Sequence, residues 1–234
     1  MNSNRKTAVV VGALFITATV ASILGSLVLL SPILDAADYL AAVSANETQV
    51  LVGVLLELTN SIAVVLIAVL LFPILKLQNE ALALGYVAFR IIESVILIVG
   101  TVSLLSLFTL SQEYVEAGAP DAAYFQTLGA SFVAVHGWTD MLGAMVIFGL
   151  TALILNYLLY QSKLVPRFIS VWGFIGAILM LAAGLLGLFG LGYLSTTSMI
   201  LVLPLALNEM VLAVWLIVKG FDPSAIAALS AKQN

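Results

Sequence analysis

The chain has no cysteine and only one histidine among its 234 residues. The absence of cysteine excludes disulfide bonds, thiolate metal ligands and a cysteine nucleophile. A single histidine excludes haem held by two histidines and zinc hydrolase sites built from several. Charged residues are also scarce, at 9% of the sequence, whereas a typical soluble domain has about 25%. The composition therefore argues against a soluble fold, and no basic tract indicates nucleic acid as a partner.

Long apolar runs dominate the sequence instead. Six of them are long enough for a helix to cross a hydrocarbon core of about 30 Å. We predict helices, because lipid-facing backbone must satisfy its own hydrogen bonds and the runs lack the alternation of a β-barrel. The predicted spans are Thr7–Leu30, Val50–Leu75, Leu82–Leu110, Ala130–Tyr160, Phe168–Phe189 and Leu194–Val218. The expected fold is an all-α, polytopic integral membrane protein: six transmembrane helices in one bundle, forming a single domain over residues 1–234.

The basic residues predict the orientation of this bundle. With six spans, every Lys and Arg except Arg90 falls on the N-terminal side of the membrane. The opposite segments contain no base but carry acidic residues, namely Asp35, Asp38, Glu47, Glu113, Glu116 and Asp121. The positive-inside rule then places both termini in the cytoplasm. We expect a multi-pass protein of the cell inner (plasma) membrane whose first span is retained rather than cleaved as a signal peptide.

Arg90 and Glu93 are the most informative residues, because they lie three apart in the middle of the third apolar run. Residues at this spacing point to the same side of a helix. A charge at the centre of a span costs about 2.5–3.5 kcal/mol, so we expect partners for this pair within the bilayer. Polar residues in the second, fourth and sixth spans supply candidates. The candidate ligand- or ion-binding residues are Glu57, Asn60, Arg90, Glu93, His136, Asp140, Asn208 and Glu209.

The depth of His136 and Asp140 has two interpretations. The two residues are four apart and therefore share a face of the fourth span. Met141–Leu159 alone could cross the membrane, which would leave both at the outer interface. Alternatively, both face a cavity that continues into the deep site.

The charge of the candidate set narrows its chemistry. Glu57, Glu93, Asp140 and Glu209 against Arg90 leave three uncompensated negative charges, which a low-dielectric interior does not tolerate. Carboxylates must therefore be protonated, or a cation must bind, or water must reach them. The alternative is a purely structural network, in which Arg90 pairs with a glutamate and the protonated remainder tie the helices together.

Two further features concern the backbone. Pro204 precedes Asn208 by four residues and removes a backbone donor, which predicts a kinked or unwound sixth helix beside the polar pair. Glycines at positions 173, 176, 184, 187, 190 and 192 crowd the fifth span and its exit. Small faces allow close helix contact, either within the monomer or in a homo-oligomer that pairs through the fifth span.

The sequence gives little support for an enzyme. No lysine lies mid-span, and no H-E-x-x-H motif, P-loop or nucleophile elbow occurs. A Glu/Asp/His metal site is compatible with the composition, but no spacing in the sequence is diagnostic of one. We therefore predict no metal and no cofactor.

Four stretches resemble a bacterial family filed as domain of unknown function 4386. They are Leu84–Val99 (LGYVAFRIIESVILIV), Leu110–Pro120 (LSQEYVEAGAP), Tyr160–Gly173 (YQSKLVPRFISVWG) and Leu203–Phe221 (LPLALNEMVLAVWLIVKGF). The resemblance covers nearly the whole chain and includes the positions of Arg90, Glu93 and Glu209. It implies a small multi-pass bacterial membrane protein and supplies no mechanism.

Three functions are compatible with these observations. The leading hypothesis is proton- or cation-coupled transport of a small solute. In it, Glu57, Glu93 and Glu209 carry the proton or cation, and Arg90 balances charge or holds an anionic group. The second is a membrane sensor or assembly factor whose polar core is structural or binds a lipophilic ligand. The third is an intramembrane enzyme with His136 as base and Asp140 as the group that orients it. The expected partners are the lipid bilayer and a small solute, proton or cation.

Overall fold

A computed structural model describes residues 3–118, 122–190 and 195–231, and these residues form helices without any strand. The chain begins with α1 (Ser3–Ser22), which continues as a π-helix, η1 (Ile23–Leu30). Short helices and two long ones follow: α2 (Ser31–Leu34), α3 (Tyr39–Ala45), α4 (Glu47–Leu75) and α5 (Glu80–Glu116). The remaining elements are α6 (Ala122–Asp140), a second π-helix η2 (Met141–Ile147), α7 (Phe148–Ser162), α8 (Arg167–Leu188), α9 (Thr196–Val218) and α10 (Pro223–Ala231).

Six helical segments within the described residues are long and apolar enough to cross a membrane, which confirms the predicted number of spans. They are Ser3–Leu34, Glu47–Leu75, Glu80–Glu116, Ala123–Ser162, Arg167–Leu188 and Thr196–Val218. Polar caps fix two of their starts: Asn79 accepts the backbone N–H of Leu82 at 3.0 Å, and Ser195 accepts that of Ser198 at 3.2 Å.

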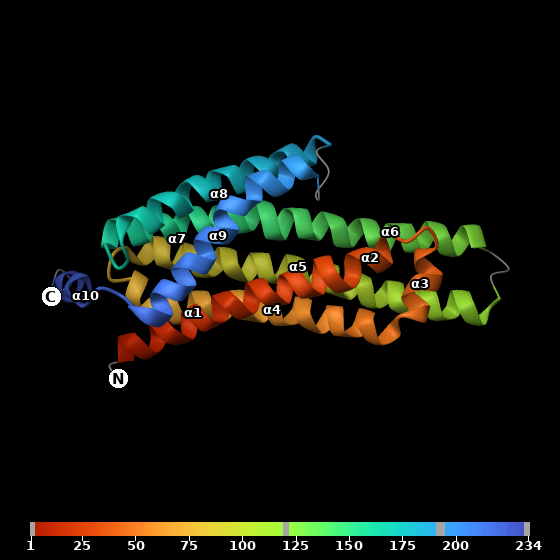
Figure 1. Cartoon of the computed structure of the whole chain (residues 1–234), viewed down its shortest axis with the longest axis horizontal. Coiled ribbons are helices and arrows are strands. Elements are labelled where there is room, and N and C mark those ends of the chain that lie inside the picture. Colours follow the sequence, from red (N-terminus) through yellow and green to blue (C-terminus); the bar gives the residue numbers. More distant parts are fainter. Residues whose placement is uncertain (1–2, 119–121, 191–194, 232–234) are drawn as a thin grey trace.

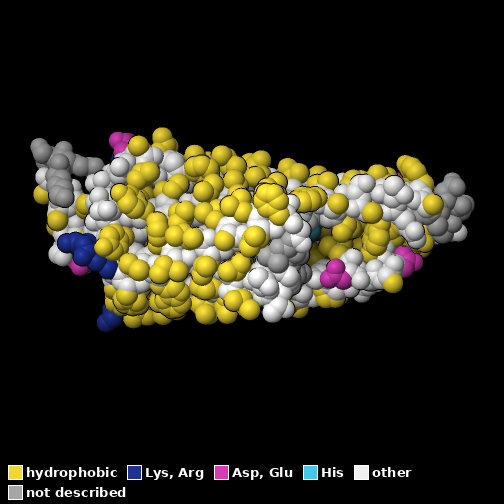
Figure 2. Space-filling model, turned by 90° about the horizontal axis from the view of Figure 1, so that it is seen from above, with side chains coloured by type: hydrophobic (Ala, Val, Ile, Leu, Met, Phe, Trp, Pro, Cys, Tyr) yellow, Lys and Arg dark blue, Asp and Glu magenta, His cyan; other side chains and the backbone are white. Residues whose placement is uncertain are grey.

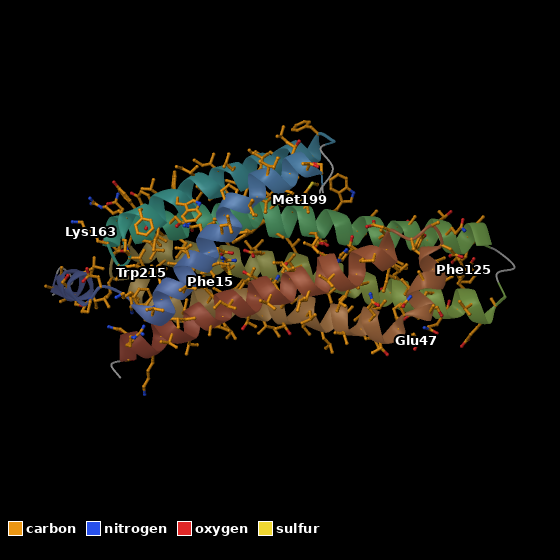
Figure 3. The ribbon with its side chains drawn as sticks, in the orientation of Figure 1. Phe15, Glu47, Phe125, Lys163, Met199 and Trp215 are labelled. Carbon is orange, nitrogen blue, oxygen red and sulfur yellow. The ribbon has the colours of Figure 1, made fainter. Side chains whose placement is uncertain are left out.

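The long helices run side by side, and both ends of the chain lie at the same end of the molecule (Figure 1). We call this the basic end, because the Lys and Arg side chains visible in Figure 2 gather there, with an apolar belt beside them. Figure 3 places Lys163 and Trp215 at the basic end, and Glu47 and Phe125 toward the opposite end. At the basic end, Arg5 of α1 caps the C-terminus of α9. Its guanidinium donates to the backbone carbonyls of Leu216 at 2.8 Å and Val218 at 3.1 Å.

The helices differ greatly in length. The 22 residues of α8 and 23 of α9 correspond to about 33–35 Å, close to the thickness of a bilayer core. The 37 residues of α5 correspond to about 55 Å, so α5 extends well past the pair formed by α8 and α9 (Figure 1). The fold therefore has a six-helix part at the basic end and a thinner extension at the other end.

The extension has a hydrophobic core of its own. Leu40 and Val43 of α3 pack with Leu104 and Leu107 of α5, and all four side chains are buried. The hydroxyl of Tyr39 donates to the backbone carbonyl of Gln126 at 2.7 Å and so ties α3 to α6. The extension is therefore held together by its own apolar contacts and not only by those of the six-helix part.

Pro204 does not unwind the sixth span, because α9 is helical from Thr196 to Val218. A methyl group added at Gly176 of α8 would lie 2.8 Å from the backbone nitrogen of Leu205. The backbone that follows the proline is therefore held directly against α8, which opposes unwinding. Of the two predicted alternatives, unwinding is wrong, and the irregular turns lie in η1 and η2 instead.

The glycines of the fifth span pack within the chain. A methyl group added at Gly173 would meet Asn156 and Asn208, and one at Gly187 would meet the sulfur of Met141. A methyl group added at Gly176 would lie 2.8 Å from Leu205 of α9, and one added at Gly184 would lie 2.9 Å from Val146 of η2. Packing within the monomer accounts for these four glycines, and a homo-oligomer through the fifth span stays a prediction. Gly190 has nothing within 4 Å of an added methyl group, and position 192 lies outside the described residues.

Candidate functional site

Arg90 lies at the centre of the six-helix part, in the middle of α5, and its side chain is buried. Its Nη1 donates to both carboxylate oxygens of Glu93, at 3.0 and 3.3 Å. Its guanidinium lies 4.9 Å from the centroid of the Phe148 ring and 5.6 Å from that of Tyr86, within the range of cation–π attraction. The expectation that Arg90 has a carboxylate partner is confirmed, and that partner is Glu93.

The two carboxylates next to Arg90 are bound in different ways. Glu93 accepts the Arg90 hydrogen bonds and also lies 3.3 Å from the donating hydroxyl of Thr151. Glu209 of α9 reaches Arg90 only as an ion pair, with 3.8 Å between Oε1 and Nη2. That distance is longer than a hydrogen bond. Glu93 is therefore the hydrogen-bonded partner of Arg90, and Glu209 is a second carboxylate held mainly by charge.

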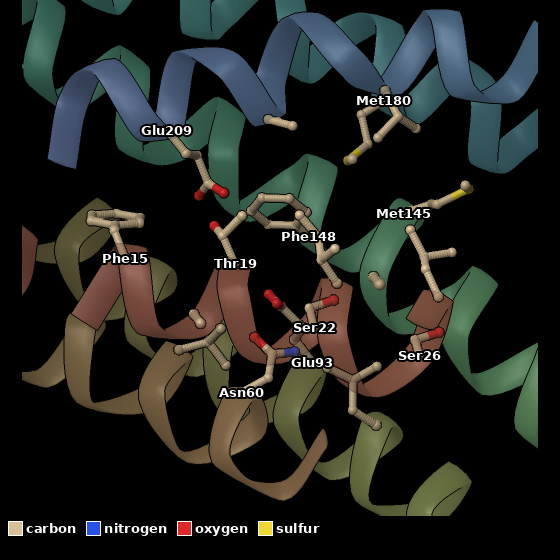
Figure 4. Close-up of a pocket in the computed structure, with 18 of the residues that line it drawn as sticks. Phe15, Thr19, Ser22, Ser26, Asn60, Glu93, Met145, Phe148, Met180 and Glu209 are labelled. Carbon is tan, nitrogen blue, oxygen red and sulfur yellow. The ribbon is translucent and has the colours of Figure 1, made fainter. Parts of the chain in front are cut away.

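A cavity of about 250 Å³ adjoins this charged group. Figure 4 shows Glu93 and Glu209 beside it, with Thr19, Ser22 and Asn60 on neighbouring helices. Most of the remaining wall is apolar, and it includes Phe15, Val64, Leu97, Met145, Phe148, Met180 and Val202. The cavity therefore combines a charged floor, a few neutral polar groups and a hydrophobic wall, as small-molecule sites do.

The cavity reaches the surface between η1 and the first turns of α9. Ile23 and Leu27 of η1 and Met199 of α9 all line it, and their exposed fractions are 47%, 39% and 51%. Met199 lies about 30 Å along α9 from Lys219 at the basic end, whereas Glu209 lies only about 15 Å from it. The charged floor is therefore near mid-depth of a bilayer core, and the mouth is near its far edge.

Both π-helices line the cavity. Ser26 and Leu27 belong to η1, and Ala144 and Met145 belong to η2. A π-helix widens the helical turn, and such turns are often found at functional sites. Neither π-helix was predicted from the sequence. The only local signals are small residues: Gly25 lies against Leu56 and Gly143 against Leu97, contacts that a larger side chain would disturb.

A second polar cluster forms around His136, away from Arg90. The His136 Nε2 atom lies 3.0 Å from Oε1 of Glu57 and 3.8 Å from Oδ2 of Asp140. The Thr101 hydroxyl lies 3.3 Å from Oε2 of Glu57 and 3.1 Å from the backbone carbonyl of Leu97, so these two acceptors share its one proton. Glu57 therefore pairs with the histidine and does not converge with Glu93 and Glu209. On α4, Glu57 faces α6, whereas Asn60, one turn later, lines the cavity.

The structure also bears on the depth of this cluster. The Met141 sulfur packs against Gly187, which lies one residue before the end of α8, so Asp140 and His136 lie beyond that end. Glu57 lies about 28 Å along α4 from Lys76 at the basic end. Neither His136 nor Asp140 is among the described residues that line the cavity. The geometry favours the outer-interface interpretation over a cavity shared with the deep site.

Asn208 is buried away from the cavity. Its amide donates to the backbone carbonyl of Ile169 at 2.8 Å and so connects α9 to α8. Asn156, which the sequence reasoning did not single out, lies nearby and donates to the carbonyl of Ala152 at 2.9 Å. Carbonyl oxygens of both asparagine side chains crowd the space above Gly173. The structure thus gives Asn208 a packing role and does not place it with the other candidates.

Thr151 is the contact to Glu93 that sequence reasoning missed. It follows Asp140 by eleven residues, about three turns of a regular α-helix, so the sequence pattern alone would put the two on one face of the fourth span; the π-helix η2 lies between them in the structure. A polar residue repeated at that interval was the available signal.

The comparisons with known proteins identify a family and no activity. A family model described as domain of unknown function (DUF4386) matches residues 10–220, and the chain belongs to this family. Neither the curated proteins nor the solved structures gave a match to the chain.

Proposed function

For this member of the DUF4386 family, we propose proton-coupled transport of a small organic cation, with Glu209 as the ion-binding carboxylate. The observation that carries the proposal is the position of Glu209: it borders a cavity near mid-depth, while Arg90, its one counter-charge within the described part of the chain, is hydrogen-bonded to Glu93. A carboxylate in that position can hold a proton or a cationic solute, one at a time. Competition for one group is what couples two ions in an exchanger.

Charge balance supports this assignment. With Glu93 and Glu209 both ionised, the floor of the cavity carries one negative charge beyond the single positive charge of Arg90. An uncompensated charge near the middle of a bilayer is costly, so the site favours uptake of one positive charge. A proton or a monovalent cation satisfies this demand equally.

The cavity wall suggests the class of solute. The wall is largely apolar, with hydroxyl and amide groups at Thr19, Ser22, Ser26 and Asn60. Sites for drug-sized ligands typically have volumes of about 300–1,000 Å³. The volume of this cavity, about 250 Å³, is smaller than that. These features suit a small alkylammonium ion, whose charge would lie at Glu209 and whose carbon atoms would contact Phe15, Phe148 and Met180.

Tetraethylammonium is a suitable probe for this proposal. Its charge is permanent, so it cannot lose a proton and cross the lipid as a neutral base. Proteoliposomes with an acidic interior should accumulate radiolabelled tetraethylammonium from a neutral buffer. Glu209→Gln should lower the initial rate at least tenfold, whereas Glu47→Gln, a change at a distant carboxylate, should not. Uptake equal to that of protein-free liposomes, or unaffected by Glu209→Gln, would refute transport of this kind.

The apolar mouth favours a second candidate function, the sensing of a lipophilic ligand. Exposed side chains of Ile23, Leu27 and Met199 border the opening, so a ligand dissolved in the lipid could enter from the side. Saturable stabilisation of the detergent-solubilised protein by a lipid-soluble amine such as tributylamine, combined with no gradient-driven uptake of tetraethylammonium, would favour this candidate over transport.

We further propose that the chain forms one integral domain of the bacterial cytoplasmic membrane, with both termini in the cytoplasm. The helix ends that lie at the basic end carry Arg5, Lys6, Lys76, Lys163, Arg167 and Lys219, as the positive-inside rule requires for a cytoplasmic face. The native chain has no cysteine, so single-cysteine variants give unambiguous labelling. In intact cells, a membrane-impermeant maleimide should label Glu116→Cys and spare Gln161→Cys, and the reverse pattern would contradict the orientation.

A further inference from the structure

The cluster of Glu57, His136 and Asp140 brings together three side chains that commonly bind metal ions. One donor atom from each lies within 4.8 Å of the other two. Glu57 comes from α4 and the other two from α6, so the tertiary fold assembles the group. We propose that this cluster binds a divalent transition-metal ion, with Zn²⁺ as the probe.

The hydrogen-bonding capacity of one ring nitrogen is the first argument. Both carboxylates approach the same atom, Nε2 of His136, at 3.0 Å for Glu57 and 3.8 Å for Asp140. A ring nitrogen carries at most one hydrogen and donates it to one acceptor at good geometry. The arrangement leaves Asp140 without that hydrogen bond. A metal ion would bind all three groups at once, because each supplies a lone pair.

The spacing of the donor atoms is the second argument. Four-coordinate Zn²⁺ binds nitrogen and oxygen at about 2.0–2.2 Å, which places neighbouring donors about 3.3–3.6 Å apart. The two separations from the His136 nitrogen, 3.0 and 3.8 Å, lie on either side of that range, and the third, between the two carboxylate oxygens, is no more than 4.8 Å. Side-chain rotations that draw the two carboxylates together would admit the ion.

Charge gives the third argument. Glu57 and Asp140 carry two negative charges when ionised, and a neutral histidine adds none. A divalent ion cancels that charge, as buried carboxylates require. Imidazole among the ligands favours zinc and its transition-metal neighbours over Mg²⁺ and Ca²⁺, which prefer oxygen ligands.

Neighbouring residues orient the proposed ligands. The Thr101 hydroxyl approaches Oε2 of Glu57 at 3.3 Å, shares its proton with the Leu97 carbonyl, and leaves Oε1, the atom nearest to His136, available to bind a metal. Such outer hydrogen bonds fix ligating groups in many metal sites. Gly100 has no side chain to separate α5 from α6, and the space above it is taken by Thr139 and by the ring of His136, at 3.5 Å. The helices therefore hold His136 at a fixed distance from α5.

The location allows entry from water. The cluster lies near the far edge of the bilayer core, about 28 Å along α4 from Lys76. The side chains of Glu57 and Asp140 are 12% and 15% exposed, so a hydrated ion can reach them. None of the three belongs to the described lining of the Arg90 cavity, so the metal proposal is independent of the transport proposal.

The single histidine makes a direct test possible. Full-length protein labelled with ¹⁵N-histidine in detergent gives ring signals from His136 alone. Titration of the chelator-treated protein with ZnCl₂ should shift its Nε2 signal and reach saturation at one ion per chain, and equimolar MgCl₂ should leave the signal unchanged. A ring spectrum that does not respond to excess Zn²⁺ would overturn the proposal.

Isothermal titration with ZnCl₂ then tests the individual ligands. Glu57→Gln keeps the shape of the side chain but should weaken affinity at least tenfold, and Thr101→Val should weaken it about 10–100-fold. Glu47→Gln is the matched control, a carboxylate at the start of the same helix that accepts a hydrogen bond from Gln112 at 2.9 Å. Glu209→Gln should bind Zn²⁺ as the wild type does. Equal affinities for Glu57→Gln and Glu47→Gln would refute the assignment of the ligands.

Discussion

Replacement of Arg90 by methionine should destabilise the fold strongly. The guanidinium is buried, it donates to both oxygens of Glu93, and the rings of Phe148 and Tyr86 lie 4.9 and 5.6 Å from it. Removal of one partner of a buried ion pair costs about 3–5 kcal/mol, because the other charge stays buried without compensation. Methionine preserves most of the side-chain length, so lost charge rather than lost volume should account for the effect.

A double variant separates this explanation from simple loss of packing. Arg90→Met combined with Glu93→Gln removes both charges, and replacement of a whole buried pair is often close to neutral. The double variant should therefore recover much of the stability that the single variant loses. Its recovery should be incomplete, because Glu209 also loses its counter-charge, at 3.8 Å from Arg90.

The quantity to measure is the free energy of unfolding in a mild detergent, obtained from a denaturant titration at constant pH. Arg167→Met is the matched control, since Arg167 is exposed and lies 5.1 Å from a single ring, that of Tyr160. Surface substitutions of this kind usually change stability by at most about 0.5 kcal/mol. If Arg90→Met is as stable as Arg167→Met, or the double variant is no more stable than the single one, the charge-pair reasoning fails.

Three further predictions concern other parts of the molecule. Because the floor of the cavity gains neutrality from one proton, thermal stability without added cations should be highest near pH 5 and should fall toward pH 8, and Glu209→Gln should flatten this dependence; a dependence of equal slope in both proteins would contradict it. Gly176→Ala should destabilise by about 1–3 kcal/mol, because its methyl group would lie 2.8 Å from the backbone of Leu205, whereas Gly85→Ala, with nothing within 4 Å, should be neutral or slightly stabilising; similar unfolding curves for the two would refute the packing argument. Hydrogen bonds from the hydroxyl and backbone of Ser224 lower the pKa of Asp222, so this cap should stabilise α10 above the pKa of a free aspartate and lose its effect as pH falls through the folded value; hydrogen exchange of α10 amides that is the same in Asp222→Ala and wild type at pH 7 would show that the cap has no effect.

Much of the fold followed from the sequence. The six apolar runs predicted the six membrane-type helices, because the thickness of a bilayer fixes the length of helix that must be apolar. The pairing of Arg90 with Glu93 was also predictable, since residues three apart share a face and a buried charge needs a partner. These are local relations, so periodicity and spacing along the chain are enough to reveal them.

The division of the candidate residues into two sites was not predictable. Glu57 could have joined Arg90 as easily as His136, because the rotation of α4 about its axis decides which neighbour it faces. The roles of Asn208 and Thr151 likewise depend on how α9 and α7 pack against α8 and α5. Charge counting treated Glu57, Glu93, Asp140 and Glu209 as one group, and the tertiary structure separates them into pairs at two depths.

The sequence alone determined that this chain is a helical membrane-type protein with ionisable groups inside its spans, because composition and spacing are local properties of the chain. Only the tertiary structure decided that Glu209 borders a cavity with Arg90, while Glu57 faces His136 and Asp140 near the far edge of the bilayer core. The physical reason is that helix rotation, the π-helical turns of η1 and η2, and close contacts at glycines are set by packing between segments far apart in the sequence.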